Sequence, residues 1–228
     1  MSDCPNANFL SYSETSQIEI LHRVYIHLIE MLEARKYSID EEDIADKKEL
    51  STFKSLFEDE NDPDISILQF VAEKIENEEQ NEVQRIAIFW SDVEKIGVKQ
   101  IKSYLDFMDE NDVNHSILIL KNPITTFGKR AIEEFNINFP SKYIEYFEYS
   151  ELLINITKHV LTPKHTLLTD TEKADLLKHY NLKKDVQLPK LHHTDAIAKY
   201  YGLRKGNVIK VTRQSGSDTN YITYRVVV

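Results

Sequence analysis

Residues 188–213 read LPKLHHTDAIAKYYGLRKGNVIKVTR and decide the character of the C-terminal part of the chain. Thr194 or Asp195 can cap a short helix in this stretch, because both side chains accept hydrogen bonds from helical N–H groups. Gly202 can end that helix, since glycine readily adopts the left-handed conformation common at helix ends. Residues 207–213 are rich in valine and isoleucine, which is typical of a strand. The stretch therefore predicts helix, turn and strand in close succession, as in a small α+β unit.

The segments on either side extend this unit. Thr169 and Glu172 have the spacing of a capping box, so we expect a helix to start there and to end near Asn181. The closing residues 221–228, YITYRVVV, predict a second strand. The loop before them, QSGSDTN, has the composition of a hairpin turn. The two strands are therefore expected to pair.

Charge divides the chain into two halves. Residues 1–150 carry 15 Lys and Arg against 31 Asp and Glu, a net charge of −16. Residues 151–228 carry 13 against 7, a net charge of +6. Such a contrast indicates two units with different surfaces, so we expect one domain in each range. The acidic half also argues against a protein that wraps nucleic acid by itself, because that function needs a basic stripe.

Composition narrows the class of protein further. The chain has 228 residues, of which 41% are hydrophobic, and this indicates a folded protein. Its single cysteine, Cys4, can form no internal disulfide or cysteine-based zinc site. We find no signal-peptide pattern and no apolar run near the roughly 18 residues that a membrane span needs. We therefore expect a soluble protein from a reducing compartment, with no membrane partner.

Helix and strand patterns alternate in the N-terminal half. Ser16 and Glu19 have the spacing of a capping box before a helix that we expect to end near Tyr37. Further helices are expected at residues 50–57, 97–112 and 126–135, and strands at residues 65–71, 85–90, 115–120 and 143–147. The charged segment EKIENEEQNE after the first of these strands predicts an exposed loop or hairpin tip. This alternation predicts an α/β domain, a sheet with helices packed on it.

Side chains that could perform chemistry do not form a recognisable set. His192 and His193 are adjacent, and His22 and His27 are five apart, so neither pair has the spacing of two metal ligands on one helix face. The sequence also lacks the glycine-rich patterns that hold phosphates and the GxSxG pattern of hydrolases. We therefore predict no catalytic residue, no metal, no cofactor and no small-molecule substrate.

A nuclease-type sheet is the one alternative with a testable spacing. In such a fold, Asp64 after Pro63 would open a metal site that a second carboxylate completes, two residues before a lysine. None of the lysines between residues 65 and 121 has an acidic residue two positions before it. We therefore expect a nuclease-like sheet without an active site. A free-standing nuclease-fold protein that binds DNA stays open as an alternative.

Ordered motifs from residue 151 onward closely resemble the C-terminal domain of the fifth subunit of eukaryotic nuclear RNA polymerases, a domain that corresponds to a small, separate subunit of archaeal RNA polymerase. The family pattern combines an ELLINIT segment, a proline–x–histidine, a TxxE helix start, a leucine–proline, an ARYYG-like helix end and a closing YxxYR. The residues that match it are Glu151, Pro163, His165, Thr169, Glu172, Leu188, Pro189, Tyr200, Tyr201, Gly202, Gly206, Tyr221, Tyr224 and Arg225.

The resemblance is weaker upstream. Residues 96–108 and the pair Phe89-Trp90 look like parts of the N-terminal domain of this family, which is called the jaw. The family usually opens its next helix with threonine–proline–serine–alanine, whereas this chain has Thr125-Thr126-Phe127-Gly128. This departure puts in doubt any contact that the missing proline and serine carry. The acidic residues 59–81 lengthen the N-terminal half, and the resemblance assigns them no role.

The resemblance implies a non-catalytic subunit of a DNA-directed RNA polymerase that anchors on the largest subunit and contacts other core subunits. The residues expected at this assembly interface are Tyr200, Tyr201, Arg204, Lys205, Arg213, Tyr221, Tyr224 and Arg225. Tyrosine and arginine are enriched at such interfaces. The competing interpretation is that residues of the closing strand fill the unit's own core, and we expect this for Ile222 and Val226.

The resemblance also implies that the jaw lies near downstream duplex DNA. Lys129 and Arg130, at a strand–helix junction, are the candidates for a phosphate contact there, with surface solvation as the alternative. A further alternative is a paralogue that works as an adaptor or chaperone outside the polymerase. We expect a nuclear location, or a virion or cytoplasmic viral factory if a virus encodes the protein.

Overall fold

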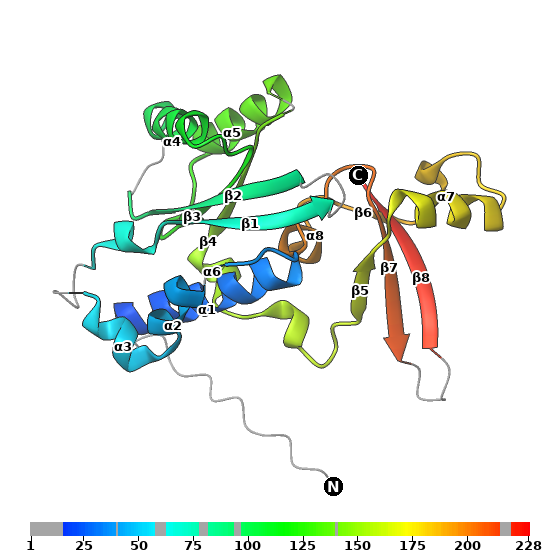
Figure 1. The fold of residues 1–228 in the computed structure, drawn as a ribbon. Helices are drawn as coiled ribbons and strands as arrows, with labels where there is room; N and C mark the ends of the chain where they lie inside the picture. Colours follow the sequence, from blue (N-terminus) through cyan, green and yellow to red (C-terminus); the bar gives the residue numbers. More distant parts are fainter. Residues whose placement is uncertain are drawn as a thin grey trace, which may run out of the picture. The chain divides into compact units, whose positions relative to one another are not determined.

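The computed structural model describes residues 16–39, 41–57, 63–77, 82–93, 97–139, 141–214 and 220–228. The chain forms two compact units, Met1–Ile154 and Asn155–Val228 (Figure 1). The sequence places this boundary at Glu151 instead. The difference arises from the short helix α6 (Tyr149–Leu152), which packs on the first helix, α1 (Gln17–Ala34). Leu152 is buried there, and its carbonyl oxygen accepts a hydrogen bond from His27 Nδ1 at 2.8 Å.

A four-stranded mixed sheet forms the centre of the N-terminal unit. Its strands are β1 (Phe70–Asn77), β2 (Glu82–Ser91), β3 (His115–Leu120) and β4 (Tyr143–Glu148), in the order β1-β2-β3-β4. β1 and β2 are antiparallel, whereas the other two pairs are parallel and are connected through helices. This confirms the predicted α/β character.

The first predicted strand was partly wrong. Residues Ile65–Leu68 form a turn of 3-10 helix, η1, because Asp64 accepts hydrogen bonds from both the backbone N–H and the hydroxyl group of Ser66. β1 starts only at Phe70 and includes the first residues of the charged segment expected to form a loop. Pairing with β2 outweighs the low strand propensity of these charged residues. The tip of the hairpin lies outside the described residues.

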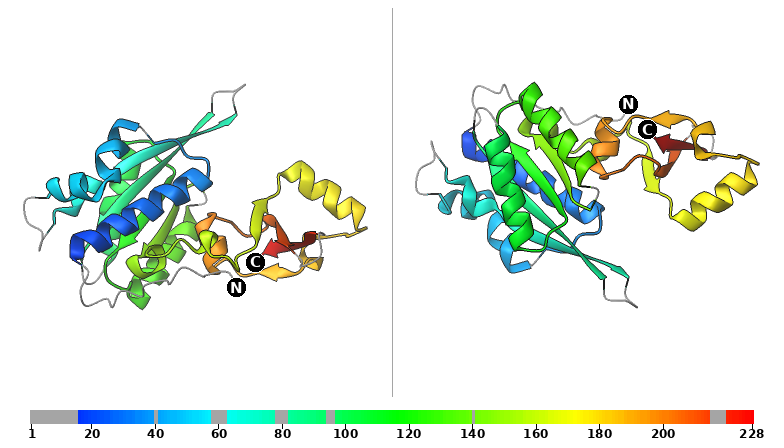
Figure 2. Two further views of the ribbon diagram at one scale, coloured as in Figure 1. Left: turned by 90° about the horizontal axis from the view of Figure 1, so that it is seen from below. Right: turned by 90° about the horizontal axis from the view of Figure 1, so that it is seen from above.

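Helices cover both faces of this sheet, as Figures 1 and 2 show. α1, α2 (Glu41–Lys48) and α3 (Leu50–Ser55) lie on one side, and α4 (Val98–Glu110) and α5 (Thr126–Asn138) lie on the other. On the α1 side, Tyr25 stacks on Trp90 with ring centroids 6.4 Å apart. On the other side, Phe89, Met108 and Phe135 belong to one buried apolar cluster. The sheet is therefore sandwiched between two helical layers.

The C-terminal unit contains a second four-stranded sheet, in the order β5-β7-β8-β6. Its strands are β5 (Lys164–Leu167), β6 (Lys190–Leu191), β7 (Val208–Gln214) and β8 (Asn220–Val227). Its helices are η2 (Ile156–Lys158), α7 (Asp170–His179), η3 (Asp185–Gln187) and α8 (Ala196–Tyr200). The predicted hairpin is confirmed, with β7 and β8 antiparallel. β5 and β6 were not predicted, because strands of four and two residues show no usable periodicity.

The predicted helix caps of this unit are confirmed in detail. Thr169 and Glu172 form a reciprocal capping box at the start of α7. Asp195, rather than Thr194, caps α8 by accepting from the N–H of Ile197 at 2.9 Å. Gly202 follows α8 with a φ of 61°, the left-handed conformation expected of it.

Each face of the second sheet buries a separate apolar cluster. We call the face that carries Val208 and Val226 the α7 face, because both side chains pack with Leu176 of α7. We call the other the α8 face, because there Ile209 and Val227 pack with Ala198 of α8. Val226 is thus in the core, as expected. Ile222 is 42% exposed, and the prediction that it is buried was wrong, because it lies on β8 beyond this cluster.

Within the ranges that the structure covers, no helix has both the length and the apolar character needed to cross a membrane.

Candidate assembly interface

The tyrosine pair predicted to contact a partner lies at the end of α8. Tyr200 is 6% exposed, and its hydroxyl oxygen accepts a hydrogen bond from Nδ2 of the buried Asn155 at 3.2 Å. Tyr201 is half-buried against the apolar cluster of the α8 face, and this burial raises the pKa of its hydroxyl group. Tyr200 therefore holds the unit together, and only Tyr201 offers surface to a partner.

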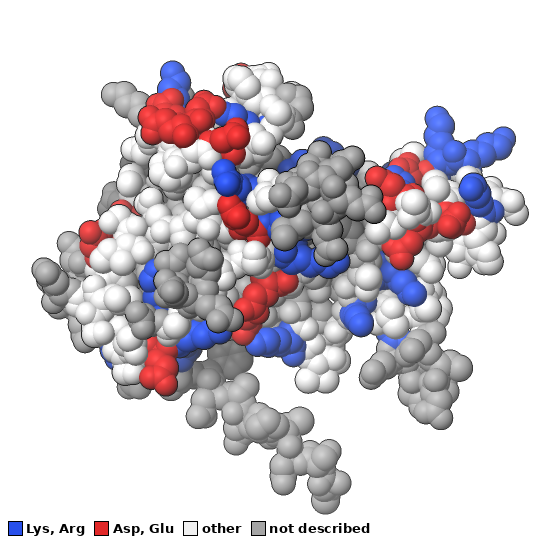
Figure 3. Space-filling model, in the orientation of Figure 1, with Lys and Arg blue, Asp and Glu red and all other residues white. Residues whose placement is uncertain are grey.

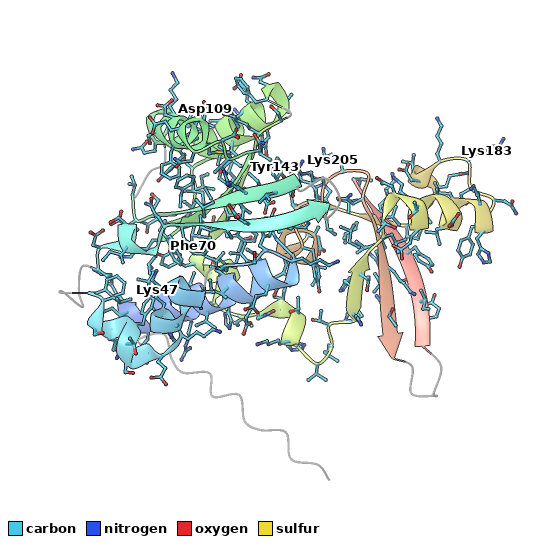
Figure 4. The ribbon with its side chains drawn as sticks, viewed as in Figure 1. Lys47, Phe70, Asp109, Tyr143, Lys183 and Lys205 are labelled. Atoms are coloured by element: carbon cyan, nitrogen blue, oxygen red, sulfur yellow. The ribbon has the colours of Figure 1, made fainter. Side chains whose placement is uncertain are left out.

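The next two predicted residues lie in the turn between α8 and β7. Arg204 and Lys205 are exposed, and Lys205 is labelled in Figure 4. The turn is held by Asn207, whose Oδ1 accepts from the backbone N–H of Arg204 at 2.6 Å. Gly206 has a φ of 91°, which only glycine adopts without strain. The turn thus fixes two adjacent cations at the surface.

The α8 face of the hairpin brings three further predicted residues together. Arg213 and Tyr221 are directly opposite each other across β7 and β8, and both are exposed. Arg225 lies further along β8 on the same face. His165 of β5 is near both arginines. Burial lowers the pKa of its imidazole, and the two positive charges lower it further. The hydrogen bond with the Pro163 backbone and the charge of Asp195 raise this pKa but do not outweigh these effects. Among the described residues, neither arginine forms an ion pair.

Tyr224 points to the opposite side of the sheet. Its ring packs beside the cluster of the α7 face, 6.2 Å from the ring of Tyr180. Because successive strand residues face opposite ways, Tyr224 and Arg225 cannot belong to one flat patch. The predicted interface residues are therefore divided between two faces of the sheet.

A groove on the α7 face, which we call the α7 groove, was not predicted. It has a volume of about 1420 Å³ and lies between α7, the β5–β7–β8 sheet and the loop before β5. Its lining includes Val160, Leu161, Lys164, Thr166, Lys210 and Tyr180. Val160 and Leu161 are 96% and 84% exposed, which is unusual for aliphatic side chains. The only sequence signal for the groove was the apolar pair just before Thr162-Pro163.

In the N-terminal unit, Lys129 and Arg130 lie in the first turns of α5. Thr125 caps this helix by accepting from the N–H of Gly128 at 3.1 Å. The Lys129 ammonium group lies 5.9 Å from the centre of the Tyr146 ring, whereas Arg130 is exposed. Phe127 beside them is 79% exposed, and sequence reasoning did not single it out.

Two carboxylates of the N-terminal unit, Asp64 and Glu145, have structural roles. Asp64 caps η1, and its hydrogen bonds with Ser66 lower its pKa. Glu145 contacts Arg35 and His115 at 2.8 and 2.9 Å. Exposed carboxylates gather over α4, the helix on which Figure 4 labels Asp109, as the charge-coloured view in Figure 3 shows. Across the described ranges, no three His, Cys, Asp or Glu residues gather in a way that suits a metal ion.

Comparison with known proteins gives matches in both units. Residues 154–227 match the family described as RNA polymerase Rpb5, C-terminal domain, and residues 15–108 match RNA polymerase Rpb5, N-terminal domain. Subunit RPABC1 of DNA-directed RNA polymerases I, II and III from Caenorhabditis briggsae is 36% identical over 214 residues, covering 91% of this chain and 95% of that protein.

Two further relatives come from other branches of the eukaryotes. The corresponding subunit rpabc1 from Dictyostelium discoideum is 44% identical over 143 residues, covering 63% of this chain and 72% of the relative. Subunit 5B of DNA-directed RNA polymerases IV and V from Arabidopsis thaliana is 32% identical over 209 residues, covering 90% of each. The chain therefore belongs to the Rpb5 family, the fifth subunit of eukaryotic RNA polymerases.

Proposed function

We propose that this protein is a structural, non-catalytic subunit of a DNA-directed RNA polymerase, and that its C-terminal unit anchors it on the largest subunit. The observation that carries the proposal is the family match across both units. The partnership with other polymerase subunits follows from the relatives, which are named as polymerase subunits. The largest subunit as the specific partner is what the family resemblance implies, and the surface of the C-terminal unit supports an anchoring contact.

The α8 face supports this inference. Arg213, Tyr221 and Arg225 present two cations and an aromatic ring on one side of the hairpin. Exposed Arg and Tyr side chains are the types that most often carry binding energy in protein interfaces. The charge of +6 on residues 151–228 suits an acidic partner surface. Tyr201 adjoins this face, because its ring centre lies 6.5 Å from that of His165, and Arg204 and Lys205 are exposed in the turn between α8 and β7.

Affinity purification of the tagged full-length chain tests the anchor. We expect the double variant Arg213→Glu, Arg225→Glu to recover at least about tenfold less polymerase, because it reverses two positive charges of the proposed interface. The matched control is Lys183→Glu, Lys184→Glu, which makes the same charge change in the loop between α7 and η3 (Figure 4). Equal recovery of the two double variants would place the anchor elsewhere.

For the N-terminal unit we propose the role of the jaw, a nuclease-like sheet without an active site that lies near downstream duplex DNA. Lys129 and Arg130 support this, because they project cations from the first turns of a helix, where backbone N–H groups also favour anions. The strongly acidic charge of residues 1–150 confines any DNA contact to such a local site.

Salt-dependent crosslinking of downstream DNA to this subunit tests the contact. We expect the double variant Lys129→Ala, Arg130→Ala to lower the crosslinking yield and to reduce its dependence on salt concentration. The control Lys102→Ala, Lys121→Ala removes two exposed lysines from other elements and should change neither quantity. An unchanged yield in the first variant would remove this pair from the DNA contact.

Two further consequences follow for the alternatives. Because the relatives belong to eukaryotic RNA polymerases, we place the protein in the nucleus, and the viral alternative has no support from these relatives. An adaptor or chaperone outside the polymerase would be recovered by the tag without the large polymerase subunits. We expect those subunits to be the main proteins recovered.

A further inference from the structure

The free edge of the second sheet has a defined set of backbone hydrogen-bonding groups. β5 lies at the end of the strand order and, among the residues that the structure describes, pairs with β7 alone. The N–H of Leu168 donates to the carbonyl of Val208 at 3.0 Å, and the register continues with Thr166 opposite Lys210. In an antiparallel pair, every second residue forms these bonds. The N–H and C=O groups of His165 and Leu167 therefore point away from β7.

The α7 groove lies directly beside this edge. Lys164 and Thr166 of β5 line the groove, together with Lys210 of β7. Its volume of about 1420 Å³ exceeds the roughly 300–1,000 Å³ of small-molecule pockets. A segment that adds to the edge of β5 would direct alternate side chains into the groove. The exposed Val160 and Leu161 offer apolar contact to such a segment.

Charge in the groove selects the kind of segment. Lys164 of β5 and Lys210 of β7 line the groove from the α7 face of the sheet, and neither forms an ion pair in the described part of the chain. The two carboxylates of the lining, Glu172 and Asp175, both belong to α7 and not to the sheet. Glu172 accepts from the Thr169 N–H at 2.8 Å, and Asp175 lies 3.9 Å from the Lys178 ammonium group. The sheet side of the groove, where a segment beside β5 would lie, therefore presents the cations Lys164 and Lys210 and is complementary to carboxylates from a partner.

We propose that an extended, acidic segment of another polymerase subunit adds to the second sheet as a strand beside β5 and places alternate side chains in the α7 groove. The proposal rests on the proposed function, because it takes the partner from the polymerase. It assigns part of the anchoring to main-chain hydrogen bonds at His165 and Leu167. A protein segment fits better than nucleic acid, because a phosphate backbone has no N–H donors to pair with a strand edge.

A proline at Leu167 tests the main-chain part of this contact. Leu167→Pro removes the outward N–H and leaves the β5–β7 bonds intact, because proline is tolerated where the missing N–H faces away from the sheet. The control Leu167→Ala also removes the leucine side chain, but it keeps the backbone N–H. With the full-length tagged chain, we expect Leu167→Pro to recover at least about tenfold less polymerase than Leu167→Ala, a loss of roughly 1.4 kcal/mol. Equal recovery would overturn the proposal.

Photo-crosslinking gives a second measurement that does not depend on the proline variant. Benzoylphenylalanine in place of Thr166 lies in the groove, and the same residue in place of the exposed Thr194 is the control. We expect the first position to crosslink to an Asp- and Glu-rich stretch of a polymerase subunit, identified by mass spectrometry. Crosslinks to nucleic acid, to a basic stretch or to no protein would overturn the proposal. If Leu167→Pro fails to fold, the crosslinking result alone tests the strand addition.

The wild-type purification separates this proposal from the function on which it rests. If the wild-type chain recovers no polymerase subunit, both fail. Suppose instead that the wild-type chain recovers the polymerase, that Leu167→Pro binds like Leu167→Ala, and that the probe at Thr166 crosslinks to no acidic stretch. The strand-addition proposal is then wrong, and the proposed function stands.

Discussion

At the scale of single residues, the N-terminal unit depends on three buried ionisable side chains. Glu145 of β4 accepts hydrogen bonds from Arg35, which follows α1, and from His115 at the start of β3. The Arg35 and Glu145 side chains are only 4% and 10% exposed. Arg35 also lies over the Phe147 ring, with 5.9 Å between its guanidinium carbon and the ring centre. This set fixes the end of α1 to the sheet, and removing one partner leaves a charge buried without compensation.

The pKa of Glu145 makes this contribution depend on pH. Burial alone would raise this pKa, but Arg35 and His115 outweigh it and lower the value from 4.5 to about 2. The ionised carboxylate therefore stabilises the fold fully above pH 4.5, and the stabilisation is lost as the pH falls towards 2. We expect Glu145→Gln to cost roughly 3–5 kcal/mol in the free energy of unfolding at neutral pH, and less as the pH falls.

Urea unfolding of the full chain at several pH values measures this difference. Glu134→Gln is the matched control, because Glu134 is exposed on α5, and we expect it to stay within about 0.5 kcal/mol of the wild type. A cost for Glu145→Gln that does not change below pH 4.5 would contradict the assignment.

At the scale of elements, four helices end in the same way, with a left-handed residue just after the helix. After α1, the N–H of Lys36 donates to the Glu33 carbonyl at 2.9 Å, and that of Tyr37 donates to Leu32 at 3.0 Å. Asp112, Asn181 and Gly202 occupy the same position after α4, α7 and α8. The sequence predicted the ends at Asn181 and Gly202, because asparagine and glycine favour this conformation. Lys36 and Asp112 gave no such signal.

Lys36 has a φ of 68°, which is costly for a residue with a side chain beyond Cβ. We expect Lys36→Gly to raise the free energy of unfolding by about 0.5–1 kcal/mol. Glycine relieves the strain of the left-handed conformation, but its greater flexibility in the unfolded chain offsets part of that gain. Lys102→Gly, in the interior of α4, should instead lower it by about 1 kcal/mol. Thermal unfolding monitored by circular dichroism distinguishes the two, and a destabilising Lys36→Gly would show that no strain is stored there.

At the scale of the whole molecule, the boundary between the units gives a direct test. Leu152, the last residue of α6, is 3% exposed, because α6 packs on α1 of the N-terminal unit. A fragment ending at residue 150 loses this side chain and the hydrogen bond from His27 to its carbonyl. We expect it to be less stable to urea than a fragment ending at residue 154, by roughly 2–4 kcal/mol. Equal stabilities would favour the boundary at Glu151 that the charge pattern indicates.

The sequence by itself determined the local features of this protein. Helix caps, the β7–β8 hairpin, the change of charge and the family motifs depend on neighbouring residues or on composition, so they are visible without a structure. Only the tertiary structure decided features that depend on pairing between distant segments. The short strand β5 exists because β7 pairs with it, and with it come the free edge and the α7 groove. For the same reason, the closing YxxYR motif matched the family, yet only the sheet showed that Tyr224 and Arg225 serve opposite faces.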